Sequence, residues 1–121
     1  MTEQTTPAHV LHAYPDWVTA LPEVDTSFPG AHGHLLSGAH GQLVLWRFDE
    51  GGSVPVHSHG PQLGMVVRGC VRMIRGGRTV AYRAGESFSL ADGENHGADI
   101  SPGTLVMELF AENDRHHARA S

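Results

Sequence analysis

Short apolar segments separated by glycine-containing breaks make up the chain from about residue 32 onward. The breaks recur too often to leave room for helices of ordinary length, and Gly76-Gly77 suits a two-residue hairpin because both positions tolerate positive φ. The expected strands cover residues 34–37, 42–48, 54–59, 62–68, 71–75, 79–83, 87–91, 96–100 and 104–110. Closely spaced strands without helices between them are typical of an antiparallel sandwich or barrel, so we expect an all-β fold.

The length and composition suit one domain with flanking segments. The chain has 121 residues, of which 40% are hydrophobic, which is enough for a single core. Four prolines punctuate residues 1–30, which are expected to form an irregular N-terminal arm with one helical turn capped by Asp16. The barrel is expected to span residues 31–112. The polar C-terminal tail, residues 113–121, is expected to fray past Arg115.

Several absences exclude classes of function. The eight basic residues are all arginine, so Schiff-base chemistry and a lysine-bearing phosphate loop are excluded. The single cysteine, Cys70, allows neither an internal disulfide nor a multi-cysteine zinc site. A net charge of −5 argues against nucleic acid as a partner. Without an apolar run long enough for a signal peptide or a membrane helix, we expect a cytoplasmic protein that does not bind membranes.

One expected strand is apolar on both faces. Along residues 42–48, Val44, Trp46 and Phe48 share one face, and Leu43 and Leu45 lie on the other. A strand in a lone small barrel should alternate apolar and polar residues. The two leucines therefore need a cover. Either the N-terminal arm or a second subunit supplies it, and we expect a homodimer.

Two histidines at i and i+2 form the strongest local feature. On a strand, His57 and His59 point to the same face, about 6.6 Å apart. Such a pair is unfavourable when both imidazoles are protonated and favourable when a divalent metal takes both neutral lone pairs. Gly51 precedes the pair by six residues, Gln62 follows it by three, and Gly69 comes seven residues after Gln62.

A second group of residues follows at a related spacing. Gly85 is followed after five residues by Ala91-Asp92-Gly93, after two more by His96, and after three more by Ile100. Together the two stretches resemble the cupin family. The first cupin motif runs glycine, five residues, HxH, three or four residues, glutamate, six residues, glycine. The second runs glycine, five residues, PxG, two residues, histidine, three residues, asparagine. The resemblance spans residues 51–100.

The cupin resemblance implies an antiparallel double-stranded β-helix, or jelly-roll barrel, with a metal site inside. It implies His57, His59, Gln62 and His96 as ligands of one divalent ion, which the sequence does not distinguish among Fe, Ni, Zn, Mn and Co. The chain departs from the family pattern at three positions. Gln62 replaces the glutamate and lies one residue closer to the HxH, Ala91 replaces the proline, and Ile100 replaces the asparagine. Gln62→Glu is expected to be tolerated and to tighten metal binding.

Other residues are candidates for catalysis or substrate contact. Glu108 shares a strand face with Val106 and Phe110, which favours the interior, and a buried carboxyl with a raised pKa suits acid or base work. Small cupins of pectin degradation, which open unsaturated uronates, look similar here because they carry an acid, an aromatic residue and a downstream arginine. Arg115 is the arginine to consider, although its spacing differs from theirs. The expected pocket walls, which also suit ordinary core packing, are Trp46, Phe48, Met65, Tyr82, Phe88 and Met107.

Three functions fit these features. The first is a metal-dependent enzyme that isomerises, cyclises, eliminates or opens a ring in a small oxygen-rich substrate by Lewis-acid polarisation. The second is a non-haem iron dioxygenase. The third is a non-catalytic module that binds or senses a small ligand. Cupin folds serve all three, so the fold alone does not decide among them.

Overall fold

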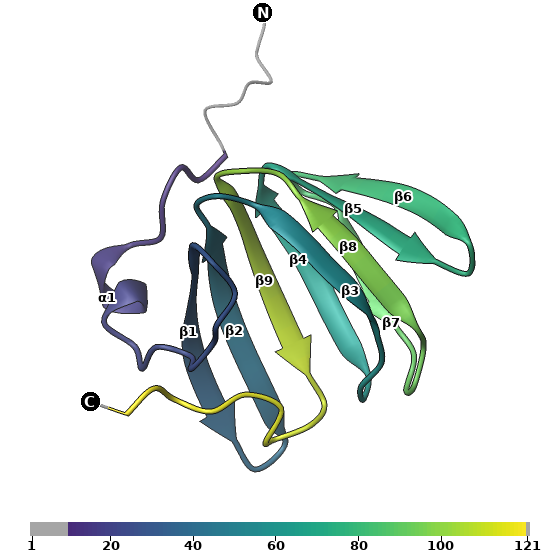
Figure 1. The fold of residues 1–121 in the computed structure, drawn as a ribbon. Coiled ribbons are helices and arrows are strands. Elements are labelled where there is room, and N and C mark those ends of the chain that lie inside the picture. The colour runs from purple at the N-terminus through teal and green to yellow at the C-terminus, as the bar shows by residue number, and fades with distance from the viewer. Residues whose placement is uncertain (1–9, 121) are drawn as a thin grey trace, which may run out of the picture.

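A computed structural model describes residues 10–120, which form nine strands and one short helix (Figure 1). The strands are β1 (Ala31–Gly38), β2 (Gly41–Phe48), β3 (Gly52–His57), β4 (Gln62–Arg68), β5 (Cys70–Arg75), β6 (Arg78–Arg83), β7 (Ser87–Leu90), β8 (His96–Ile100) and β9 (Thr104–Phe110). Every strand expected from the glycine spacing is present, and the strands pair antiparallel. The predicted all-β antiparallel fold is confirmed. The start of the expected arm, residues 1–9, lies outside the described residues.

Two sheets enclose the core of this jelly roll (Figure 1). The larger sheet has the strand order β1-β2-β9-β4-β7, and the smaller has the order β3-β8-β5-β6. Val44, Val66 and Val106 from the larger sheet are at most 2% exposed, and they belong to one apolar cluster with Met73 and Ala98 from the smaller sheet. The inward faces of the two sheets therefore share one core.

Strand β4 shows how alternation divides residues between the interior and the outer face. Gln62, Gly64 and Val66 are buried, whereas Leu63 and Met65 between them are 53% and 47% exposed. Successive strand residues point to opposite sides of a sheet. The inward placement of Gln62 therefore requires Leu63 and Met65 to point outward.

The helix is a single turn within the arm. Helix α1 (Asp16–Thr19) begins after Pro15, and no side-chain bond caps it. The expectation that Asp16 caps this turn is wrong, because Pro15 occupies the N-cap position and Asp16 is already helical. Within residues 10–120 there is no helix with the length and apolar character needed to cross a bilayer.

The N-terminal arm covers part of the outer face of the larger sheet. Tyr14 and Val18 form a second buried cluster with Leu45 and Leu105. The Tyr14 hydroxyl donates a hydrogen bond to the backbone oxygen of Trp46 at 3.0 Å, and its burial raises the pKa of this phenol. The cover required for Leu45 is thus supplied by the arm of the same chain.

The C-terminal tail returns to the barrel instead of fraying past Arg115 as expected. The Gln42 side chain bonds both backbone groups of His116: its amide donates to the carbonyl oxygen at 2.9 Å, and its oxygen accepts from the N–H at 2.8 Å. An isolated bridge then pairs Val24 of the arm with Ala118. These bonds join residues that are distant in sequence. The polar composition of residues 113–121 therefore could not predict that the tail is ordered.

Candidate metal centre

His57 reaches the interior because β3 is irregular. This strand lies at the edge of the smaller sheet, where Pro55 is tolerated because its missing N–H costs no ladder bond. The pairing of β3 with β8 shifts register between Val54 and His57, where His57 pairs with His96. Strict alternation would place residues 54 and 57 on opposite faces, whereas the shift allows both side chains to line the same cavity.

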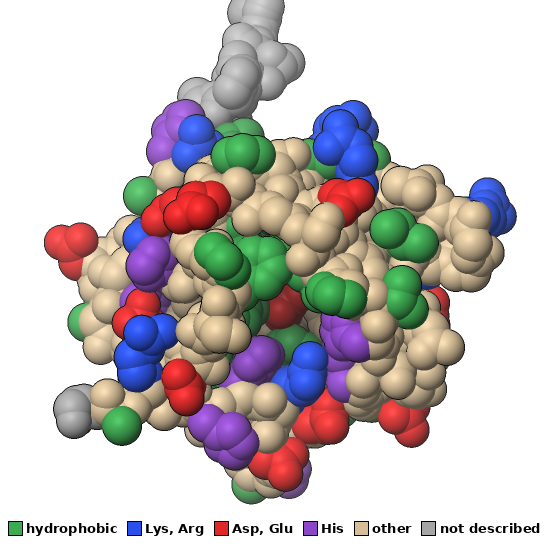
Figure 2. Space-filling view, viewed as in Figure 1, with side chains coloured by type: hydrophobic (Ala, Val, Ile, Leu, Met, Phe, Trp, Pro, Cys, Tyr) green, Lys and Arg blue, Asp and Glu red, His purple; other side chains and the backbone are tan. Residues whose placement is uncertain are grey.

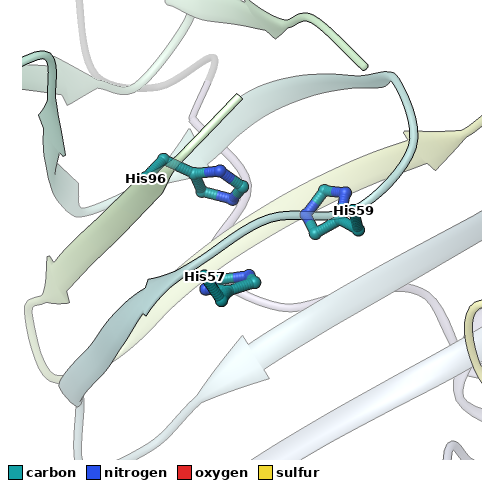
Figure 3. A group of neighbouring side chains, drawn as sticks. All are labelled: His57, His59 and His96. Carbon is teal, nitrogen blue, oxygen red and sulfur yellow. The ribbon is translucent and has the colours of Figure 1, made fainter. Parts of the chain in front are cut away.

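Three imidazoles converge in this cavity (Figure 3). His57 ends β3, His59 lies in the loop that leads to β4, and His96 begins β8. The ring centroids are 5.3 Å apart for His57 and His59, 4.4 Å for His57 and His96, and 4.8 Å for His59 and His96. One nitrogen from each ring lies within 4.8 Å of the other two, a grouping that can hold a metal ion.

Backbone carbonyl groups select the tautomer of all three rings. In each imidazole, Nδ1 lies within hydrogen-bond distance of a backbone oxygen. The pairs are His57 with Pro55 at 2.8 Å, His59 with Gly60 at 2.8 Å and His96 with Glu94 at 2.9 Å. A carbonyl oxygen can only accept, so Nδ1 must carry the proton, and the lone pair remains on Nε2. This arrangement orients histidines for metal binding.

Burial also favours the neutral imidazoles. It lowers the pKa of His59 and of His96, and the charge of Arg115 near His59 and of His57 near His96 lowers each further. The backbone bonds oppose these effects. Because metal ligands must be unprotonated, a lowered pKa extends the pH range in which these two rings can bind a cation.

A hydrogen-bonded chain on the facing sheet connects Trp46, Glu108 and Gln62. Trp46 Nε1 donates to Glu108 Oε1 at 2.8 Å, and Gln62 Nε2 donates to Glu108 Oε2 at 2.9 Å. Burial raises the pKa of the Glu108 carboxyl, while the two donated bonds and the Arg115 charge oppose the rise. Since the Gln62 amide uses its NH₂ group toward Glu108, its oxygen Oε1 is the atom it can offer to a cation.

The returning tail brings Arg115 and His116 to the cavity lining. Arg115 Nε is a buried side-chain polar atom without a hydrogen-bond partner among the residues described. Burial and the nearby Arg115 charge lower the pKa of His116 to about 4, so this ring is neutral at physiological pH. Arg115 is therefore a charged group in the cavity with unused hydrogen-bonding capacity.

His116 was not identified from the sequence. Its ring lies edge-on to Trp46 and Phe110, with centroids 5.6 and 5.1 Å away. The residue follows the last strand, and neither a metal motif nor strand periodicity points to it. The two hydrogen bonds from the Gln42 side chain that position His116 can be seen only in the tertiary structure.

The cavity has a volume of about 200 Å³, and its lining tests the expected pocket walls. Trp46, Phe48 and Phe88 line it. Tyr82 packs against Phe88, with ring centroids 5.1 Å apart, and is outside the lining. Figure 2 shows the hollow, with hydrophobic and acidic side chains in its floor and histidine and arginine side chains along its lower edge.

Met65 and Met107 require a correction. They lie in a separate shallow groove on the outer face of the larger sheet, not in the cavity. The two residues are paired across β4 and β9 and share the outward face. Their neighbours Gly64 and Glu108 pair in the next row, and Glu108 lines the cavity. The expectation that these two residues are pocket walls rested on side-chain type, and methionine suits either face of a sheet.

The donor set fits a divalent metal ion of borderline softness. His57, His59 and His96 each present a neutral nitrogen, and Gln62 can present a neutral oxygen. Imidazole nitrogen is a common ligand of zinc, copper, iron and nickel. Four protein ligands would leave room on a five- or six-coordinate ion for a substrate atom, which is the arrangement of a catalytic site rather than a closed structural one.

Comparisons with known proteins agree with this architecture. A family model described as a cupin domain matches residues 44–111, more than half of the chain. No curated protein matches the sequence.

Solved structures extend the comparison. The structure of KdgF from Halomonas sp. is 26% identical with a TM-score of 0.67, and the match covers 75% of this chain and 87% of that one. An RmlC-like cupin from Shewanella frigidimarina is 27% identical with a TM-score of 0.67, covering 78% and 86%. A chain in the crystal structure of Rhodobacter sphaeroides SigE in complex with the anti-sigma ChrR is 21% identical with a TM-score of 0.58. The match covers 72% of this chain and 47% of that one, and shows likeness of fold alone.

His57→Ala should lower the affinity for a divalent ion at least about 100-fold, because one of three nitrogen ligands is lost. The fold should persist, since His57 is at the end of an edge strand. Metal content after dialysis, measured by mass spectrometry, and far-ultraviolet circular dichroism check the two expectations. His40→Ala, at an exposed turn, is the matched control. Full metal occupancy in the His57 variant would show that the site is assigned wrongly.

The bond from Gln62 to Glu108 changes what is expected of Gln62→Glu. The new carboxylate would face Glu108 without a donor, so the metal-free variant should lose about 1–3 kcal/mol of unfolding free energy. A bound cation should stabilise the variant more than the wild type because it gains a charged ligand. Gln62→Ala should lose stability without this gain. Denaturant titrations with and without Zn²⁺ measure both effects, and an unchanged metal-free stability would contradict the expectation.

Proposed function

The chain belongs to the cupin family, and from this premise we propose that it is a metal-dependent enzyme that isomerises, cyclises, eliminates or opens a ring in a small oxygen-rich molecule. One observation carries the proposal. Three imidazoles with free Nε2 atoms share a cavity with Glu108, a carboxyl whose pKa is raised by burial. A site for a cation and a group able to transfer a proton thus line the same space.

The chain's own residues divide the chemical work. An ion held by His57, His59, His96 and Gln62 would supply Lewis-acid polarisation of a substrate oxygen. Glu108 gives or takes a proton at a substrate carbon or oxygen, and its raised pKa brings it closer to neutral pH, where general acid–base catalysis is most efficient. Arg115 binds and orients an anionic substrate group through the guanidinium that it brings to the cavity lining.

Binding alone would not require a buried carboxyl beside the cation site. A carboxyl in an apolar interior is unfavourable unless it is bonded, and Glu108 uses two donors, Trp46 and Gln62, to remain there. Groups whose pKa is perturbed by burial in a cleft concentrate at catalytic sites. This supports an enzyme over the non-catalytic module.

Glu108→Gln should reduce turnover about 100-fold or more while leaving metal content unchanged, because the amide keeps the size and cannot transfer a proton. Proton NMR in D₂O follows isomerisation and solvent deuterium incorporation with enolisable keto acids and unsaturated uronates. Glu50→Gln, at an exposed turn, is the control and should match the wild type.

Oxygen consumption and metal content, measured together with turnover, separate the other two functions. Oxygen consumption that depends on iron would assign the dioxygenase reaction and overturn the isomerase or lyase proposal. Full metal occupancy without turnover of any substrate in the panel would favour the binding module. Equal turnover in the Glu108 variant would remove this carboxyl from the mechanism.

We also propose that the chain forms a homodimer through the outer face of the larger sheet. Register places Leu36, Leu43, Leu109 and Leu63 in one row across four adjacent strands. Leu36, Leu109 and Leu63 are 44%, 48% and 53% exposed, whereas Leu43 packs against the cluster that the arm forms around Leu45. A second copy related by a two-fold axis would present the same uncharged row, so apolar groups would cover each other.

Leu63→Asp should weaken this dimer about 30-fold or more, because a charge would be buried within the apolar contact. Val80→Asp is the matched control, since Val80 is also exposed but lies on β6 of the other sheet. Sedimentation equilibrium measures the dissociation constant. A wild-type mass of 13.0 kDa at high protein concentration would overturn the dimer.

A further inference from the structure

The polar groups of the cavity lie at one end of the barrel. On the smaller sheet, His57 pairs with His96, and the next inward pair along the same strands is Val54 with Ala98. Farther along β8, Ile100 pairs with Val71 of β5. Inward residues thus change from imidazole to aliphatic within one row, about 6.6 Å along a strand.

The larger sheet repeats this change in the same direction. Gln62 pairs with Phe110 in one row, and Glu108 follows in the next. Beyond Glu108, Trp46 pairs with Val106, and Phe48 follows at the end of β2. Polar side chains therefore give way to aromatic and aliphatic ones on this wall too.

Contacts between elements show that the change from polar to apolar inward residues runs in the same direction on both sheets. At the polar end, the His59 ring lies 5.6 Å from Phe110. At the other end, Phe28 from the arm packs 5.6 Å from Phe48 and also lies against Gly52 at the start of β3. The rows of the two sheets are thus aligned, and the cavity has one polar end and one apolar end.

Among residues 10–120, the side chains that line the apolar end offer a ligand no hydrogen bond. Its lining includes Phe28, Phe48, Val54, Val71, Met73 and Ile100. The indole N–H of Trp46, at the boundary, is already donated to Glu108. A ligand hydroxyl buried here would lose its bonds to water without replacement, at a cost of about tenfold or more in affinity.

Arg115 supplies the complementary feature at the polar end. Arg115 lines the cavity together with Glu108, His59 and His116, which places the guanidinium among the polar groups. Its buried Nε is unpaired among residues 10–120. A planar guanidinium matches a carboxylate, which accepts two parallel hydrogen bonds.

The size of the cavity limits the ligand to one with about one ring. An engineered apolar cavity of about 150 Å³ binds benzene. The cavity here, with about 200 Å³, has room for a ring-sized apolar body and a small head group.

From these observations we infer that the cavity takes a small carboxylic acid with an apolar, ring-sized body, and discriminates against polyhydroxylated acids such as uronates. The inference rests on the proposed function for the use of this site. It narrows the substrate from an oxygen-rich molecule in general to one whose oxygen atoms are confined to the carboxylate end. The carboxylate lies among Arg115 and the imidazoles, and the apolar body extends past Val54 toward Phe48 and Phe28.

Cyclohexanecarboxylate and glucuronate are the matched test ligands, because each combines a six-membered ring with one carboxylate and only glucuronate carries hydroxyls. Isothermal titration of the metal-free protein measures binding without dependence on turnover. Cyclohexanecarboxylate should bind at least about 100-fold more tightly, since several hydroxyls would be buried unpaired. Glucuronate binding as tightly or more tightly, or no detectable binding of cyclohexanecarboxylate, overturns the inference.

Three variants locate the two ends of the ligand. Arg115→Gln should weaken both acids about tenfold because the charged hydrogen bonds to the carboxylate are lost. Val54→Thr keeps the side-chain shape but adds a hydroxyl, and should weaken cyclohexanecarboxylate several-fold relative to glucuronate. Val56→Thr is the control on the same strand, where Val56 is 61% exposed, and should change neither affinity. Equal effects of the two valine substitutions would overturn the placement of the apolar body.

The outcome is separable from that of the proposed enzyme function. Absence of metal binding in the wild type would remove the metal-dependent reaction and leave the ligand preference measurable. Preference for glucuronate would remove the apolar ligand class and leave the metal centre intact.

Discussion

The constraint on which the site depends is the burial of a carboxyl group between the two sheets of the barrel. Glu108 shares its inward face with Val106 and Phe110, and a carboxyl there must be hydrogen-bonded to be tolerated. Trp46 and Gln62 each donate to one of its oxygens. The bond from Gln62 also determines which atom of that amide can face a cation. The acid group and the amide oxygen that could face a cation are therefore parts of one hydrogen-bonded network.

The cavity has a polar end and an apolar end because two sheets pack face to face. The inward rows of both sheets change from polar to apolar at the same distance from the polar end. His57 and His96 form the polar row on one wall, and Gln62 begins it on the other. The C-terminal tail completes this end by bringing Arg115 to the cavity lining. The Gln42 side chain holds the tail there through two hydrogen bonds to the backbone of His116. The polar and ionisable groups are thus concentrated at one end, while the remaining inward rows are apolar.

Local features made much of the fold predictable. Glycines with positive φ, such as Gly76 and Gly77, mark turns through a backbone preference that does not depend on distant residues, and all nine strands were expected from such breaks. The histidine grouping was also predictable, because HxH is a local pattern and the later histidine follows at the family's spacing. The inward placement of His57 depends on a register shift in β3 that alternation does not predict.

The sequence by itself determined the strands and the fold class, because turns act within a few residues. The grouping of His57, His59 and His96 was implied by the resemblance to the cupin family. Tertiary structure alone decided that Met65 faces outward, that His116 lines the cavity, and that Gln62 bonds Glu108. These outcomes depend on pairing between strands and on contacts between residues far apart in the chain. Their energies come from burial and from bonds that exist only once both sheets are in place.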